Sequence, residues 1–290
     1  MIEGALLSWW QEAWSWLDLP FMVRAMGATT VLCLGLAPVG AFLVLRRLSL
    51  AGEAIAHAVV PGIAIAFVIA GLGVWSMLVG GPIAGLFVAL ASSLLARVSL
   101  VREDASLAAL YLIALALGIF VLSVGGSAVP LERFLFGDVI GMRQENVLLI
   151  GWVTTITVVT LALVLRPLVV QSLDPTFFES QVKQPQLIQL IFMLLVVLNL
   201  IAAFRTLGTL MAVGLMILPA VAARFWASSM TSYLILSVVF AILSCWSGLL
   251  TSYFIDTPSG PSIVLAAGVI FLVSLLLGPN GLSPFARKKN

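Results

Sequence analysis

Long apolar stretches separated by short polar links dominate the chain, and they predict a series of membrane-crossing helices. A helix needs about 20 apolar residues to span the hydrocarbon of a bilayer. Stretches of this kind cover 21–45, 51–72, 80–97, 106–124, 147–168, 186–204, 208–227, 232–253 and 261–278. They give nine spans, or eight if the stretch after Arg205 is a broken or re-entrant helix. We therefore predict an all-α polytopic membrane protein with eight or nine transmembrane helices.

Composition and charge agree with this architecture. Of the 290 residues, 62% are hydrophobic and 9% are charged, whereas soluble domains carry about 25% charged residues. The high hydrophobic share makes the lipid bilayer the expected environment, and a net charge of +2 leaves no basic patch for nucleic acid. Under the nine-span count, arginine and lysine follow every second span, which predicts that these ends are cytoplasmic, with the N-terminus outside and the C-terminus inside.

Three parts of the chain differ in composition. Residues 1–20 place four tryptophans among acidic residues, which suits either an amphipathic helix at the membrane interface or an ordinary leader to the first span. Residues 21–286 are predicted to form a single transmembrane permease domain. Residues 287–290 form a basic tail, predicted to be cytoplasmic.

Glu53 and His57, the only histidine of the chain, lie inside an apolar predicted helix. Because they are four residues apart, both side chains point from one face of that helix. A carboxylate in hydrocarbon costs about 2.5–3.5 kcal/mol on insertion scales, so it needs a partner, water or a cation. Carboxylate and imidazole together form a ligand pair for a divalent transition metal. The alternative is a hydrogen bond within the helix that merely neutralises both groups.

The surroundings of this pair favour the metal interpretation. Small residues flank it, which would let helices approach closely or leave a cavity. Pro61 lacks the amide hydrogen that would bind the His57 carbonyl, so this oxygen is left as an acceptor. Since the sequence offers no second histidine, further ligands would come from water, the backbone or a second copy in a dimer. We expect Zn²⁺ or Mn²⁺ as a passing substrate, with zinc favoured, and no permanently bound cofactor.

Three polar segments are weaker candidates. Asp256 lies in a turn between the last two spans, where a helix-capping role is favoured over a carboxylate on the ion's path. Asp138 would either receive an ion from outside or pair with Arg143. In the polar segment 171–186, Asp174 and Pro175 resemble the cap and first residue of a short helix. The segment by itself favours a solvated connector over a docking element.

Some motifs are absent from the sequence. No GxxxxGK[ST] loop is present, so this chain carries no P-loop for ATP. Transport against a gradient would then depend on a separate ATPase or on coupling to another ion. Cys33 and Cys245 lie alone in apolar stretches, and helix packing is favoured for both over a ligand or disulfide role.

The sequence resembles the zinc/manganese permease family of ABC transporters. The similarity is carried by 46–62, 135–141, 173–177, 207–224 and 253–261, in family order across nearly the whole chain. The resemblance implies a type II ABC importer-like permease that is not itself an enzyme. It also implies a homodimer, cytoplasmic ATP-binding subunits and an extracytoplasmic metal-binding protein, in a bacterial inner membrane. Glu53 and His57 match the family's intramembrane acid and histidine, although that acid is usually aspartate.

The same resemblance assigns a role to the segment around Asp174. It implies that Asp174, Pro175, Thr176 and Phe177 belong to a helix that couples the permease to its ATPase. Two other hypotheses stay open: a siderophore or cobalamin-type ABC permease, and an ion-coupled secondary transporter with Glu53 as proton carrier.

Overall fold

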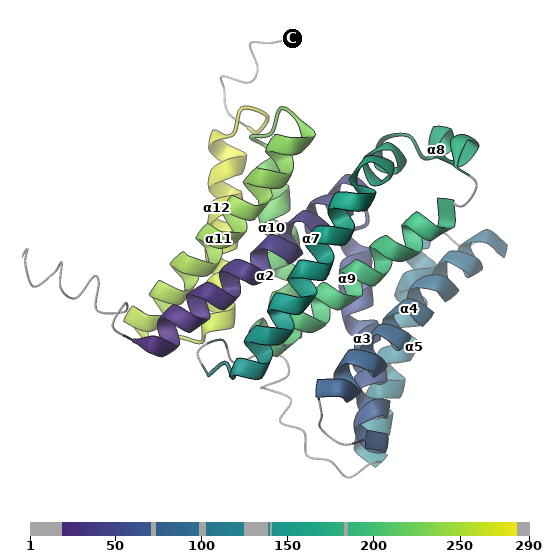
Figure 1. Ribbon diagram of the computed structural model, residues 1–290, viewed down its shortest axis with the longest axis horizontal. Helices are drawn as coiled ribbons and strands as arrows, with labels where there is room; N and C mark the ends of the chain where they lie inside the picture. Colours follow the sequence, from purple (N-terminus) through teal and green to yellow (C-terminus); the bar gives the residue numbers. More distant parts are fainter. Residues whose placement is uncertain are drawn as a thin grey trace, which may run out of the picture.

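The computed structural model describes residues 19–70, 74–98, 103–124, 139, 141–182 and 185–282, and all regular structure within them is helical (Figure 1). The helices are α2 (Pro20–Leu45), α3 (Ser49–Ala70), α4 (Val74–Val98), α5 (Glu103–Val124), α7 (Gln144–Leu173), α8 (Pro175–Gln181), α9 (Pro185–Leu207), α10 (Thr209–Arg224), α11 (Met230–Ile255) and α12 (Ser259–Leu277).

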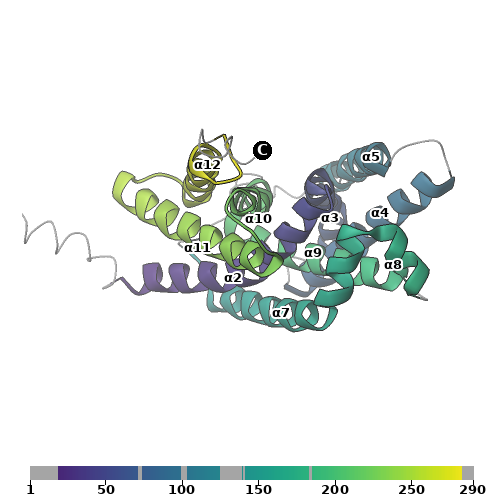
Figure 2. The same ribbon diagram turned by 90° about the horizontal axis from the view of Figure 1, so that it is seen from above.

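Two groups of three helices flank a central set. The helices α3, α4 and α5 pack on one another, as do α10, α11 and α12. Between these groups lie α2 and α9, each of which contacts helices of both groups, and α7 packs against α2 and α9 at the edge of the bundle (Figure 2). The short helix α8 lies at one end of the bundle, where α7 ends and α9 begins (Figure 1).

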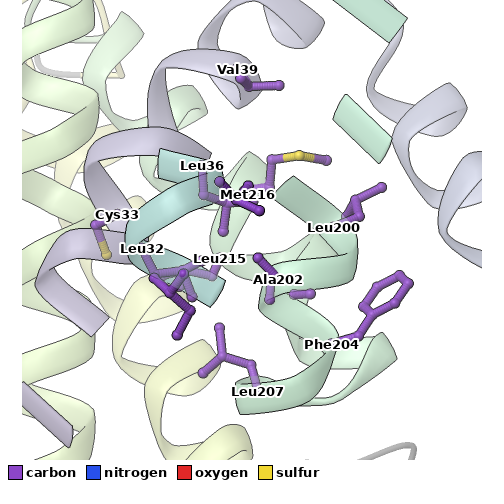
Figure 3. Close-up of a cluster of buried hydrophobic side chains, with 14 of the residues drawn as sticks. Leu32, Cys33, Leu36, Val39, Leu200, Ala202, Phe204, Leu207, Leu215 and Met216 are labelled. Carbon is purple, nitrogen blue, oxygen red and sulfur yellow. The ribbon is translucent and has the colours of Figure 1, made fainter. Parts of the chain in front are cut away.

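Close packing of α2, α9 and α10 forms the centre of the core. Leu36, Leu200 and Met216 are fully buried there, among other apolar side chains (Figure 3). In lipid, helices associate through close van der Waals contact, which small residues permit. Gly40 is one such residue, because an added Cβ would lie 1.8 Å from the Met216 carbonyl oxygen. A larger residue at position 40 would therefore push α2 away from α10.

Buried polar groups join the three central helices. The Asn199 side chain on α9 donates to the Thr157 hydroxyl on α7 at 2.7 Å. The Thr154 hydroxyl, also on α7, donates to the carbonyl oxygen of Val31 on α2 at 3.1 Å. Such interhelical bonds contribute about 0.6 kcal/mol on average within membranes. They help to set the register of α2, α7 and α9, to which α8 is attached.

The predicted helices are confirmed, with boundaries close to the predicted ones. Each of the nine apolar stretches corresponds to one long helix of the described chain. Counted over the described residues alone, five of them are long and apolar enough to cross a membrane, namely α2, α7, the Pro185–Phe204 part of α9, α11 and α12. Helix α10 has 16 residues, which at 1.5 Å per residue falls short of about 30 Å of hydrocarbon.

The break before α10 explains why the number of spans was ambiguous. A single residue, Gly208, separates α9 from α10 and adopts a φ of 81°, a conformation that glycine tolerates readily. The eight- and nine-span alternatives therefore both remain predictions. Of the predicted interfacial segment 1–20, the structure describes only residues 19 and 20, and the basic tail 287–290 lies outside the described residues. Both segments therefore also remain predictions.

Candidate functional site

Glu53 and His57 lie in the first half of α3, in its second and third turns. The Glu53 side chain is exposed on this chain and His57 is half-buried. The neighbouring Ala54, Ala56 and Ala58 are buried. Small residues were expected either to let helices approach closely or to leave a cavity. The burial of these alanines shows that they pack against neighbouring parts of the protein. The Glu53 side chain is exposed, whereas the imidazole of His57 lies against α5.

Helix α5 packs against the His57 side of the Glu53 and His57 pair. The rings of His57 and Tyr111 are stacked, with centroids 5.8 Å apart and an interplanar angle of 25°. Among the described residues, the contact of the imidazole is thus with Tyr111 and not a hydrogen bond to Glu53. Tyr111 also packs beside Ala54 and Leu107. The sequence analysis did not include Tyr111 in the site. The one sequence feature that could have pointed to it is that it is one of three tyrosines in the chain and lies in an apolar helix.

Pro61 holds α3 against α5 one turn beyond His57. It lies inside α3, and an added Cβ on Gly118 of α5 would lie 2.8 Å from the Pro61 Cα. On the other side of α3, a Cβ on Gly62 would lie 2.1 Å from the carbonyl oxygen of Gly80 on α4. These backbone contacts fix the helix that carries Glu53 and His57 between two neighbours.

The pair offers two ligands, which cannot complete a coordination shell alone. No group of three or more histidine, cysteine or acidic side chains able to hold a metal occurs among the described residues. The arrangement can therefore bind a cation only together with water, backbone oxygens or groups of another chain. Such open coordination suits an ion that is passed on more than one that is stored.

The structure does not bring Asp256 to this pair. Asp256 is the C-terminal capping residue of α11, with a left-handed φ of 56°, and its backbone N–H donates to the Ser252 carbonyl. Helices α11 and α12 pack with α10 and α2, on the opposite side of the bundle from α4 and α5 (Figure 2). The capping role favoured by the sequence is therefore present. Asp138 lies outside the described residues, and Arg143 is exposed.

Asp174 caps α8 as the sequence predicts. Its Oδ1 accepts the backbone N–H of Phe177 at 2.9 Å, and Pro175 occupies the first turn. Phe178 faces the protein and is 3% exposed, whereas Phe177 and Leu173 are 55% and 75% exposed. Thr176 is also exposed. The segment contains a short capped helix, and it exposes the apolar Leu173 and Phe177 beside polar residues. The solvated connector and the docking element both stay predictions.

Arg46 lies beside the base of α8, and its role was also missed by sequence reasoning. Its Nε donates to the Ser172 hydroxyl at 3.1 Å and one terminal nitrogen donates to the Gln171 side chain at 2.8 Å, both at the end of α7. The other terminal nitrogen donates to Gln189 on α9. Burial lowers the pKa of Arg46 to about 10, which still leaves the guanidinium protonated at neutral pH.

Comparison with known proteins identifies the class. Residues 18–278 match the family described as the ABC 3 transport family, so the chain belongs to that family. It is accordingly a membrane permease subunit of an ABC transporter, in which the ATPase is a separate chain.

Individual relatives match most of the length of the chain. It is 30% identical over 264 residues to the "Manganese transport system membrane protein MntC" of Halalkalibacterium halodurans, covering 91% of this chain and 89% of that protein. It is 27% identical to the "Chelated iron transport system membrane protein YfeD" of Yersinia pestis, covering 93% and 89%. The solved structure "PsaBC from Streptococcus pneumoniae in complex with Fab" matches with a TM-score of 0.84 at 28% identity, covering 95% of this chain and 99% of that chain.

Proposed function

We propose that this chain imports divalent transition-metal ions, and that Glu53 and His57 hold the ion during its passage. The observation that carries the proposal is their position: an exposed carboxylate and an imidazole supported by Tyr111 share one face of α3. Oxygen and nitrogen ligands of this kind suit Mn²⁺ and Zn²⁺. Family membership supports ATP as the energy source, and it argues against an ion-coupled secondary transporter.

Manganese is the ion that we propose to test first. The relatives support it by name, since MntC is named for manganese. The preference for zinc rested on the general affinity order of divalent metals, and no relative given above is named for zinc. YfeD is named for chelated iron, so a chelate is a necessary competitor in the assay.

We further propose that the working unit is a homodimer. Glu53 is exposed on a single copy of the chain, so a second copy would be able to contact it. Two ligands from each copy would give two carboxylates and two imidazoles around one ion. This arrangement would also remove Glu53 from lipid, where a lone carboxylate is costly.

We propose that α8 is the contact for the ATP-binding chain. It is short, capped by Asp174 and carries the exposed Phe177, with the exposed Leu173 just before it. Their exposure at the end of the bundle leaves these two apolar side chains available to a partner chain. An extracytoplasmic metal-binding protein would deliver the ion at the opposite end. The bacterial relatives support the cytoplasmic membrane as the location.

Uptake of radioactive manganese by cells that express the whole transporter tests the metal site. His57→Ala and Glu53→Gln should each lower uptake at least tenfold, because either change removes one of two ligands. Glu145→Gln serves as the matched control, since Glu145 is an exposed acid in the first turn of α7. Excess unlabelled Mn²⁺ should compete, whereas an iron chelate should not. Normal uptake by both variants at normal expression would refute the site.

A further inference from the structure

Arg46 connects α8 with the helix that carries Glu53 and His57. It is the C-terminal capping residue of α2, and α3 begins three residues later at Ser49. Its three donor groups reach the end of α7 and the start of α9, the two helices that flank α8. The guanidinium carbon also lies 4.6 Å from the ring centroid of Phe192 on α9. One side chain thus contacts both attachments of α8.

The guanidinium is suited to a rigid connection. Its planar fork fixes several donors in one orientation, and less freedom is lost for each hydrogen bond than with a flexible ammonium group. The Phe192 ring below it is fully buried and packs edge-on against Phe42 of α2, with centroids 6.3 Å apart. The half-buried charge therefore rests on a fixed surface, and Arg46 cannot swing away without losing all of these contacts.

The turn that follows Arg46 is rigid as well. The Leu48 N–H donates to the Leu43 carbonyl at 2.9 Å, and the Arg47 N–H donates to the Val44 carbonyl at 3.1 Å. With Arg47 at a φ of 59°, these two bonds form a Schellman motif. The Gly52 N–H then donates to the Leu48 carbonyl at 3.2 Å. The backbone is hydrogen-bonded from α2 into the turn of α3 that carries Glu53.

From this geometry we infer that Arg46 is a positioning residue that transmits movement of α8 to the metal site on α3. The inference rests on the proposed roles of α8 and of Glu53 and His57. Displacement of α8 by the ATP-binding chain would move the adjoining ends of α7 and α9. Arg46 would carry that displacement into the α2–α3 turn, and the turn would rotate or shift the start of α3.

The test measures manganese uptake and ATP hydrolysis together in vesicles containing the complete transporter. Arg46→Ala should lower uptake at least tenfold while ATP hydrolysis stays within twofold of the wild type. The ATP consumed per ion would therefore rise at least fivefold. Arg46→Lys should behave similarly, since a compact ammonium group lacks the planar fork that spreads its donors toward separate acceptors. Arg47→Ala is the matched control: Arg47 is the adjacent arginine, is exposed, and would keep its backbone strain as alanine.

Two measurements keep the inference separable from other failures. If Arg46→Ala reduces folding, Gln171→Ala and Gln189→Ala each remove a single acceptor and should raise the ATP consumed per ion in the same direction. His57→Ala in the same vesicles tests the metal site independently of Arg46. Normal manganese uptake by the His57→Ala variant would refute the proposed metal site, whatever result the Arg46 variants give. An unchanged ratio in the Arg46 variants, with uptake and hydrolysis normal or falling in parallel, would overturn the role of Arg46.

Discussion

Two turns of the molecule share one unusual backbone conformation but are held in different ways. Arg47, between α2 and α3, and Asp256, between α11 and α12, both adopt left-handed φ values, 59° and 56°. The first turn is bound through Arg46 to side chains of α7 and α9. The second is closed by its own neighbours: the Ser252 hydroxyl donates to the Thr257 carbonyl, and the hydroxyls of Thr257 and Ser262 lie 3.0 Å apart.

The difference separates a turn that can transmit movement from one that only closes a hairpin. Within the part of the chain that the structure describes, the side-chain hydrogen bonds around Asp256 join residues of the same hairpin and none connects that turn to another helix. The α2–α3 turn is connected to segments more than one hundred residues away in sequence. We therefore expect changes at Arg46 to affect transport and changes at Asp256 to affect it little.

A larger effect on manganese binding is expected at Tyr111, beside the α3 site, than at Asp256. Stacked aromatic rings contribute about 0.5–1.5 kcal/mol beyond their buried area, so Tyr111→Ala should weaken manganese binding about two- to tenfold. Tyr111→Phe keeps the ring and should bind as the wild type does. Asp256→Asn should also leave affinity unchanged. Binding is measured by titration of the purified protein, and a stronger effect at Asp256 than at Tyr111 would reverse the comparison.

The smallest effect concerns the two left-handed residues themselves. A residue other than glycine costs roughly 1–2 kcal/mol in this conformation, and asparagine and aspartate tolerate it better than most. Arg47→Gly should therefore raise the free energy of unfolding by about 0.5–1 kcal/mol, and Asp256→Gly by less. Denaturant unfolding in detergent measures both. Equal effects, or a loss of stability at position 47, would show that side-chain contacts and not backbone strain dominate there.

Much of the fold was predictable because its signals are local. Apolar length alone located the long helices, since the thickness of the bilayer sets the length of a span. The Asp174 cap was predictable because the capping side chain and its backbone partner are three residues apart. Glu53 and His57 share a face for a similar reason, being one helical turn apart.

The rest could not be predicted because it depends on contacts between distant segments. Arg46 lies 126 positions from Ser172 and 143 from Gln189, and nothing in either local sequence marks the pairing. The stacking of Tyr111 on His57 depends on how α5 packs against α3. Likewise Cys33 and Cys245, predicted as packing residues, are both buried with their sulfur atoms 3.5 Å apart, across a separation of 212 positions.

Titration of the purified permease with Mn²⁺ and with Zn²⁺ tests the metal site most directly. The wild type and Glu145→Gln should bind at least one of these ions with the same affinity. His57→Ala and Glu53→Gln should each weaken that binding at least tenfold, because each removes one of the two side-chain ligands. Unchanged affinity for both ions in both variants would contradict the account, since the ion would then be held elsewhere in the protein.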